Sequence, residues 1–592
     1  MRKITTFLSL MLFSLFFIQC KTVMKTVMKT QDFKVLTENY FKEKNTLNPL
    51  EATLNGQNEY NDQLVFEMTD SYRKKRRQFF DTYLKQLQNV DASKLSDEEK
   101  NSFDIIKWEC EIGFELLKQN ANLTPINQFD GPHLTMGQLA SGESAQPFKT
   151  VKDYQNFLKR IDLYSIWIDS AMVYMKKGMQ KNVVLPKALT LKVIPQFEEM
   201  ITPKVENNLF YSTIKKFPAD FTEEQKNTLK KQYTVAISEK LMPQFQKLVA
   251  FLKTDYLPVS RTTSGIGSLE GGNELYKVYV KQWTTTDKTP EDIHQLGLKE
   301  VARIKAEMEK VKNQVGFKGT IIEFFDFVRN NPALKPFKKP EEVLANFEKN
   351  YQIIKPNVDK LFSLQPKTPF QIKRTESFRE KTASAEYIQG AADGSRPGTF
   401  YVPIPDVTNY NFYGDEDLFL HEAIPGHHFQ ISLQQENAAL PDFRKFNWFG
   451  AYGEGWALYT ESLGKELGMY TDPYQYFGML GNEMLRATRL VVDTGMHYKG
   501  WTREQAIQYD LDNLAENESV IVQEIERYMA IPGQALSYKI GQLKIIELRQ
   551  KAQKEMKDKF DIKMFHQKVL ESGVMPLALL ENKIDTWIKT GK

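Results

Sequence analysis

The chain has 592 residues, of which 41% are hydrophobic and 26% are charged, as in soluble globular proteins with a large buried core. Its 79 lysine and arginine residues nearly match its 75 acidic residues, which gives a net charge of +4. This balance argues against a dedicated nucleic-acid binder, which concentrates positive charge, and we expect no nucleic-acid partner.

The first twenty residues resemble a bacterial export signal. Two basic residues precede an apolar run over 7–18 that is too short to span a bilayer. Cys20 follows this run, as the lipidated cysteine of a lipoprotein does, although Gln19 is larger than the residue usual at that place. An ordinary secretory signal with an incidental cysteine is the alternative. We expect residues 1–20 to form a lipoprotein signal, so that a lipid on Cys20 anchors the exported protein to a membrane of the cell envelope, at its periplasmic or outer-membrane face.

Residues 21–30 repeat the tetrapeptide Lys-Thr-Val-Met and are predicted to form a tether behind the signal. After them, apolar residues recur at the three- and four-residue spacing of helices. No linker rich in proline, glycine or serine follows, and no repeat of solenoid length is visible. We therefore expect one large helical domain over residues 31–592, with early helices at 72–87, 151–176, 222–253 and 291–311.

The last third of the chain predicts further helices, preceded by a small sheet. The segment Gly398–Ile404 alternates like a strand between glycine and proline, which indicates a sheet near residues 383–410. Thr502 and Gln505 have the spacing of a capping box at a helix start. The expected fold class is therefore mainly α, with a small β-sheet beside the functional cleft and late helices at 415–436, 450–468, 472–498, 502–514, 516–556 with a break, and 561–590.

His421 and Glu422 lie inside an apolar helical pattern, where imidazole and carboxylate groups need a partner. Zinc is such a partner, because neutral imidazoles and a carboxylate bind it and leave one position for water. A glutamate beside the first ligand then accepts the proton of that water, which predicts Glu422 as a general base. Histidines satisfied in a core or at the surface are the alternative, but three of the chain's 7 histidines fall close together here.

The spacing in this segment departs from the usual His-Glu-x-x-His, because Pro425 stands where the second histidine would be. On a regular helix His427 would point about 120° away from His421, and His428 would lie about 10.5 Å further along the axis. Pro425 removes a helical hydrogen bond, and Gly426 tolerates unusual dihedral angles. Because a bulge at this point would bring His427 beside His421, we predict His427 rather than His428 as the second ligand.

A second acidic segment offers the third ligand. Glu454 and Glu461 are seven residues apart and share a helix face that is otherwise apolar. One carboxylate can bind the metal while the other holds a ligand imidazole through its second nitrogen. An exposed pair of glutamates on a surface helix is the alternative. We expect the metal site within residues 415–540.

Six segments together have the pattern of a known family: Thr289–His294, Arg396–Tyr401, His421–Gln430, Glu454–Glu461, Asp493–His497 and Arg527–Ala535. In these segments the chain resembles a large bacterial family known as domain of unknown function 885, over most of its length. That family is in turn similar to the helical zinc peptidases typified by angiotensin-converting enzyme and carboxypeptidase Taq. The resemblance implies a zinc-peptidase-like helical fold, with one Zn²⁺ per chain bound by His421, His427 and Glu454 and with Glu461 behind them.

The resemblance also suggests residues that act on the substrate. An Arg-Tyr pair late in the converting-enzyme chain supplies a tyrosine to the reacting carbonyl, and Arg527-Tyr528 is similar to it. Tyr528 is thus predicted to be catalytic, and Tyr538 is a second candidate donor to the oxyanion. Each tyrosine also fits ordinary core packing. Asp493 and His497, one helical turn apart, are expected either to line the substrate cleft or to form a hydrogen-bonded pair on a helix surface.

These residues predict zinc-dependent hydrolysis of peptide bonds in small peptides. The strand Thr399–Ile404 is expected to hold the extended peptide by edge pairing. A zinc hydrolase of a non-peptide amide or ester would use the same machinery, so it stays an alternative. A non-catalytic helical binding lipoprotein is the other alternative, but it gives no function to His421 and Glu422.

Overall fold

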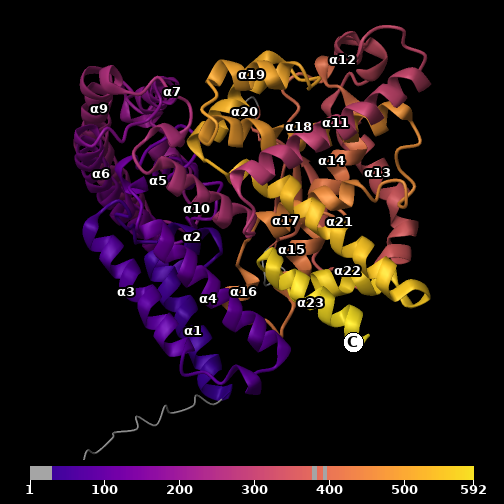
Figure 1. Cartoon of the computed structure of the whole chain (residues 1–592). Helices are drawn as coiled ribbons and strands as arrows, with labels where there is room; N and C mark the ends of the chain where they lie inside the picture. The colour runs from indigo at the N-terminus through magenta and orange to yellow at the C-terminus, as the bar shows by residue number, and fades with distance from the viewer. Residues whose placement is uncertain (1–29, 377–379, 381–382, 391–395, 592) are drawn as a thin grey trace, which may run out of the picture.

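The computed structural model describes residues 30–376, 380, 383–390 and 396–591. The predicted signal, Cys20 and the tether up to residue 29 lie outside the described residues. Helices make up most of the structure, with one small sheet, so the predicted mainly α class is confirmed (Figure 1). Within the described part, no helix combines the length and the apolar content that crossing a bilayer requires.

The first half of the chain folds into helices that lie side by side on one side of the molecule (Figure 1). The predicted helix over 222–253 is divided into two helices by a π-helical stretch at Ala236–Leu241. The helices are α1 (Thr30–Leu47), α2 (Pro49–Leu54), α3 (Asp70–Leu87), α4 (Asp97–Leu117), α5 (Pro132–Ala140), α6 (Val151–Gln180), α7 (Lys187–Glu198), α8 (Glu223–Val235) and α9 (Met242–Phe251).

The second half contains the helices on which the predicted site residues lie. Capping boxes begin two of them at Thr289 and Thr502, and the sequence predicted the one at Thr502. The predicted helices over 415–436 and 561–590 are each two helices. The elements are α10 (Gly272–Thr284), α11 (Pro290–Gln314), α12 (Ile321–Asn330), α13 (Pro340–Leu361), α14 (Asp415–Glu422), α15 (His427–Glu436), α16 (Asp442–Lys445), α17 (Gly450–Glu461), α18 (Pro473–His497), α19 (Arg503–Leu511), α20 (Glu518–Ala530), α21 (Ser537–Met556), α22 (Ile562–Leu570) and α23 (Leu577–Thr590).

The small sheet has the strand order β1-β3-β2, with strands β1 (Phe370–Arg374), β2 (Glu386–Ile388) and β3 (Gly398–Val402). Strand β1 pairs parallel to β3, and β2 pairs antiparallel to it. The predicted strand is therefore confirmed as β3. Edge pairing of a peptide along Thr399–Ile404 is wrong, because β3 lies between two other strands and both of its edges are used.

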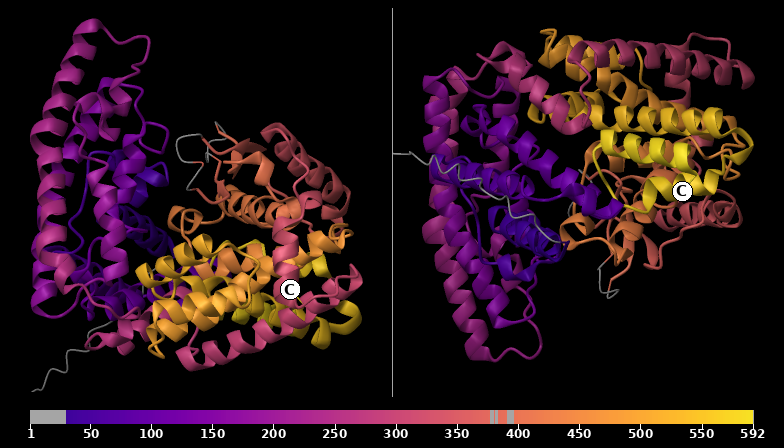
Figure 2. Two further views of the ribbon diagram at one scale, coloured as in Figure 1. Left: turned by 90° about the horizontal axis from the view of Figure 1, so that it is seen from above. Right: turned by 60° about the horizontal axis from the view of Figure 1, so that its bottom comes forward.

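Buried apolar side chains form two clusters. One joins α1, α3 and α4 to most of the chain after residue 266, and it surrounds the predicted metal site. The other lies among α5–α9 and the loops that connect them, within residues 64–256. The view from above separates the indigo and magenta helices of the first half from the orange and yellow helices of the second (Figure 2). The predicted extent of one domain over residues 31–592 stays a prediction.

Candidate metal centre

The segment between α14 and α15 replaces one turn of helix with a tight loop at residues 423–426. Gly426 allows this loop, because a Cβ atom at that position would lie 1.9 Å from the carbonyl oxygen of His421. The side chains of α17 satisfy carbonyl groups that the break leaves without helical partners. Trp456 Nε1 donates to the Pro425 oxygen at 2.9 Å, and Thr460 Oγ1 donates to the Leu420 oxygen at 3.0 Å. The helix that carries the two predicted glutamates thus also fixes the histidine loop.

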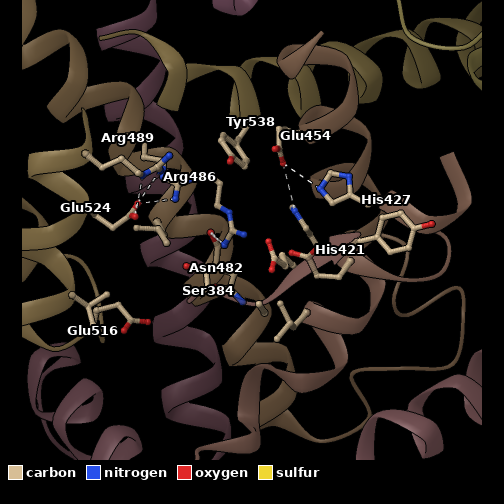
Figure 3. A pocket seen from close by; sticks show the side chains of 18 of the residues that line it. Ser384, His421, His427, Glu454, Asn482, Arg486, Arg489, Glu516, Glu524 and Tyr538 are labelled. Atoms are coloured by element: carbon tan, nitrogen blue, oxygen red, sulfur yellow. Dashed lines mark hydrogen bonds and ion pairs between the residues drawn. The ribbon is translucent and has the colours of Figure 1, made fainter. Parts of the chain in front are cut away.

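This loop brings His421 and His427 beside each other. Their ring centroids are 4.8 Å apart and the ring planes are perpendicular. Both Nε2 atoms face one carboxylate oxygen: Glu454 Oε2 lies 3.6 Å from His421 Nε2 and 3.4 Å from His427 Nε2. One possible ligand atom from each of the three residues lies within 4.8 Å of the others (Figure 3). The three residues that the sequence predicts as ligands therefore converge.

The donor set fits a zinc ion. Two imidazoles and one carboxylate are common zinc ligands, with bonds of about 2.0–2.2 Å, and tetrahedral ligands at such bonds lie about 3.4 Å apart. The distances from Glu454 Oε2 to the two imidazole nitrogens match that separation. His421 is 4% exposed and His427 is 9% exposed, so both imidazoles are largely shielded from water.

Glu461 fixes the orientation of His421 from the side away from Glu454. Its Oε1 atom lies 2.6 Å from His421 Nδ1, so Nδ1 carries a hydrogen and Nε2 keeps its lone pair in the neutral imidazole. Although burial opposes it, hydrogen bonds to Glu454 and Glu461 raise the pKa of His421 to about 10. The same two histidines hold the pKa of the buried Glu454 carboxyl well below its usual range. The surroundings thus favour positive charge between these side chains.

Glu422 follows His421 directly at the end of α14. It is 8% exposed and lines the same cavity as the three converging residues. Burial raises the pKa of Glu422, and the neighbouring His421 and His427 oppose that rise. A carboxylate whose proton affinity is increased in this way suits the acceptance and return of a proton.

The cavity has a volume of about 680 Å³ and separates two walls. One wall carries the converging histidines and Glu454, and the other is formed by α18 and α20 (Figure 3). The segment that leads into β2 closes a third side through Ser384 and Tyr387. The lining residues of the two walls include Leu418, His421, Glu422, His427, Glu454, Asn482, Leu485, Arg486, Arg489, Glu524, Arg527 and Tyr538.

Tyr538 reaches the cavity because α17 and α21 cross very closely. A Cβ atom on Gly455 would lie 2.5 Å from the Cα atom of Gly541, so the two glycines let the helix backbones touch. This contact brings Tyr538 to the side of Glu454 that faces the cavity (Figure 3). Burial raises the pKa of Tyr538, which keeps its hydroxyl protonated and able to donate.

The prediction that Tyr528 acts on the substrate is wrong for this geometry. Tyr528 is 1% exposed and is not among the residues that line the cavity. Its hydroxyl accepts a hydrogen bond from Arg489 Nε at 2.9 Å and donates to Glu524 Oε2 at 2.6 Å. Arg527 does line the cavity, but its Nη2 pairs with Glu524 at 3.0 Å. Of the two candidate tyrosines, the cavity contains Tyr538.

The prediction that Asp493 and His497 line the cleft or form a surface pair is also wrong. Both are fully buried inside the helix packing. Asp493 Oδ1 accepts from the Tyr276 hydroxyl at 2.5 Å and from the Gly533 amide at 3.1 Å. His497 Nδ1 accepts from the Ile266 amide at 3.1 Å. These side chains join α18 to neighbouring segments.

His428 points away from the converging ligands. Its Nδ1 atom lies 2.9 Å from the Tyr387 hydroxyl, and its ring packs on Phe370 with centroids 4.9 Å apart. Burial lowers the pKa of His428 to about 4. This histidine connects α15 to the sheet, and it is His427 that lies beside His421 and Glu454.

Arg486 and Arg489 line the cavity but were not predicted. Asn482, Leu485, Arg486 and Arg489 have the spacing of one helix face, and two arginines in an apolar helical stretch were the available signal. Phe129 also lines the cavity, from a loop before α5, nearly 300 residues before the histidines. No local signal in the sequence could have placed Phe129 there.

Comparison with known families gives a match over residues 49–584 to DUF885, described as a bacterial protein of unknown function. The chain belongs to the DUF885 family. The family that the sequence motifs suggested is thereby confirmed. No curated protein matches the sequence.

Two solved structures are similar to this member of the DUF885 family, each described as that of a "putative lipoprotein". The one from Colwellia psychrerythraea is 29% identical, with a TM-score of 0.85, and the match covers 94% of this chain and 99% of that chain. The one from Shewanella oneidensis, described as of unknown function, is 18% identical, with a TM-score of 0.72, and the match covers 93% and 99%. The second likeness shows the shared fold alone.

Proposed function

We propose that this DUF885 protein is a zinc-dependent hydrolase that cleaves peptide bonds in small peptides. The observation that carries the proposal is the convergence of His421 Nε2 and His427 Nε2 on Glu454 Oε2, inside a cavity that also contains Glu422. His421, His427 and Glu454 would hold the ion. The sequence resemblance to helical zinc peptidases supports the choice of peptide bonds.

When bound, zinc supplies a Lewis acid for the substrate carbonyl and makes water more acidic. Glu422 accepts the proton of the attacking water and returns it to the leaving amine, which its raised pKa favours. Glu461 keeps His421 in the tautomer that leaves Nε2 free. The Tyr538 hydroxyl donates to the oxygen of the carbonyl as negative charge develops on it.

The proposal includes a location at the cell envelope. The Colwellia protein, which shares 29% identity over 94% of this chain, carries the lipoprotein description. The position of Cys20 behind a short apolar run supports the same assignment for this chain. Labelling of Cys20 by a radioactive fatty acid in the native host, with Cys20→Ser as control, tests the lipid anchor.

The test of the activity compares the wild-type chain with Glu422→Gln on a library of short peptides. The wild type loaded with one zinc ion is expected to cleave peptides, whereas Glu422→Gln binds zinc but loses about 10²- to 10⁴-fold in rate, as loss of a general base does. Exposed Glu504 offers a matched control, and Glu504→Gln should keep full activity.

Three outcomes would replace the proposal. Cleavage of non-peptide amides or esters instead of peptides would assign a different substrate to the same machinery. A folded chain that binds no zinc would favour a binding lipoprotein. Equal rates for wild type and Glu422→Gln would remove Glu422 from the mechanism.

A further inference from the structure

The wall opposite the candidate metal ligands is rich in arginine. Arg489 pairs with Glu524 through Nη2 at 2.8 Å, and Arg527 pairs with the same carboxylate at 3.0 Å. Although burial opposes it, these two arginines hold the pKa of Glu524 well below its usual range. This cluster has two positive charges and one negative charge, and Arg489 and Glu524 lie at the side of the cavity away from His421 (Figure 3).

Arg486 lies between that cluster and the candidate metal ligands (Figure 3). Its Nη1 atom donates to the backbone oxygen of Asn482 at 3.2 Å, within its own helix. Its Nε atom is buried and has no hydrogen-bond partner among the described residues. In contrast to Arg489 and Arg527, Arg486 forms no ion pair with any residue in the part of the chain that the structure describes.

An arginine in such a place is unusual. A guanidinium keeps its charge in proteins and presents N–H donors in a planar fork, so a half-buried arginine is normally paired with a carboxylate or phosphate. The apolar side chains of Leu418 and Leu485 line the same space and reduce the screening of the charge by water. Arg486 therefore lines a cavity large enough for a ligand, and its guanidinium charge has no carboxylate partner among the described residues.

We propose that Arg486 binds a carboxylate of the substrate, so that the cavity selects peptides with a carboxylate close to the scissile bond. The inference rests on the proposed function only for the statement that the bound molecule is a peptide. A planar carboxylate matches the guanidinium fork with two parallel hydrogen bonds. The carboxylate comes either from the free C-terminus of the peptide or from an aspartate or glutamate side chain.

Acidic residues also line the cavity, among them Glu422, where Arg486 opposes the rise that burial causes in the pKa without forming an ion pair. Glu524 is neutralised by its two arginines. Burial raises the pKa of Asp510 to about 7, so its negative charge is reduced near neutral pH. Burial raises the pKa of Glu516, which also lines the cavity; Arg329 and Arg486 oppose that rise, and Glu516 forms no ion pair with Arg486. A cavity that instead selected cations would bind lysine peptides more tightly, which the experiment below measures.

The experiment uses calorimetric binding of short peptides to the mature chain after zinc has been removed with a chelator. The probes are acetyl-trialanine as free acid, acetyl-trialanine amide, and two amides in which the middle alanine is replaced by glutamate or by lysine. One or both carboxylate peptides should bind about 10- to 100-fold more tightly than the neutral amide, as hydrogen bonds to charged groups do. Tight binding of the free acid assigns the C-terminus, and tight binding of the glutamate amide assigns the side chain.

Arg486→Gln is expected to remove the preference, and Arg486→Lys to remove part of it, because lysine keeps the charge but not the fork. Arg77 is exposed on α3, far from the cavity in the sequence and the fold, and Arg77→Gln should leave all affinities unchanged. Circular dichroism checks that the variants are folded, and Arg486→Lys serves as the test if Arg486→Gln is not.

The proposal would be overturned by equal affinities for all probes, by tighter binding of the lysine peptide or by the absence of any binding. It would also be overturned by a preference that survives Arg486→Gln. Because the protein contains no zinc in these measurements, the result does not depend on catalysis. Binding without any cleavage by the zinc-loaded chain would leave the carboxylate site in place and remove the peptidase function. Cleavage by the zinc-loaded chain without any preference for a carboxylate would support the peptidase function and remove the carboxylate site.

Discussion

Two pairs of buried histidines have opposite surroundings in this molecule. His497 on α18 and His566 on α22 are fully buried, and both ring nitrogens of each contact protein groups. For His566 these are the Leu361 oxygen and the Tyr459 hydroxyl, each at 2.8 Å. His421 and His427 are buried to a similar degree, but their Nε2 atoms face only Glu454, at 3.6 and 3.4 Å.

The charge preferences of His497 and His566 differ from that of His421 in the same way. Burial lowers the pKa of His497 and of His566 to about 3, so both are neutral parts of the packing. Glu454 and Glu461 instead raise the pKa of His421 to about 10 against the effect of burial. Burial alone therefore does not identify a functional histidine. The distinguishing feature is that two ring nitrogens from different histidines face one shared carboxylate oxygen.

The largest expected effect is on zinc content. His421→Ala and Glu454→Ala each remove one of three ligands and should abolish stoichiometric zinc binding, measured by mass spectrometry of the purified chain. His566→Ala should keep one zinc per chain but lose about 2–5 kcal/mol of unfolding free energy, because it leaves a cavity and two unpaired polar groups. The comparison fails if His566→Ala loses zinc while remaining folded, or if His421→Ala keeps it.

The second expected effect compares Tyr538, which lines the cavity, with Tyr528, whose hydroxyl is paired with other side chains. Tyr538→Phe removes a hydroxyl that lines the cavity, and kcat on a peptide substrate should fall about 10²- to 10³-fold, as when an oxyanion donor is lost. Tyr528→Phe removes a hydroxyl that Arg489 and Glu524 already occupy, and it should change kcat much less. Steady-state kinetics measure both, and equal losses would contradict the assignment of Tyr538.

The third expected effect tests the contact behind His421. Glu461→Gln keeps an acceptor for Nδ1 but removes the charge, and zinc affinity should fall about 10- to 100-fold. Competition with a fluorescent zinc chelator measures this change. Glu466 is five residues further along the chain and pairs with Arg549 at the surface, so Glu466→Gln is the matched control and should leave the affinity unchanged. An unchanged affinity in Glu461→Gln would mean that the contact only supports packing.

The sequence predicted the residues that converge on one side of the cavity, because the evidence for them is local. His421, Glu422 and His427 lie within seven residues, and Pro425 with Gly426 explains how the helix breaks between them. Glu454 and Glu461 belong to one helix face, so their relation follows from helical periodicity. The mainly α class and the capping boxes at Thr289 and Thr502 also depend on short-range patterns.

The other wall depends on how helices pack, which spacing does not determine. Arg527 and Tyr528 are adjacent, but neighbouring residues point about 100° apart on a helix, so the rotation of α20 decides which one meets the cavity. The rotation of α18 likewise turns Arg486 toward the cavity and Asp493 into the core. Strand β1 was not predicted either, because each of its residues pairs with a residue of β3 that lies 28 positions further along the chain.

The last expected effect is on stability in acid. The pKa of His566 is about 3 in the folded chain, against about 6.5 for an unfolded histidine. Its contribution to stability is therefore complete above pH 6.5 and is lost as the pH falls toward 3, because the unfolded chain binds the proton first. The loss is about 1.4 kcal/mol per pH unit for this one residue.

His566→Gln lacks the titrating group, so its free energy of unfolding should fall less steeply between pH 6 and pH 4 than that of the wild type. Urea unfolding at several pH values, with zinc removed, measures the two slopes. The difference between variant and wild type isolates His566 from the buried carboxyl groups, which titrate in both proteins. Equal slopes for variant and wild type would mean that His566 takes up a proton in the folded chain as it does in the unfolded chain. His566 would then not be a neutral packing residue, and the contrast with the proposed zinc ligands would fail for it.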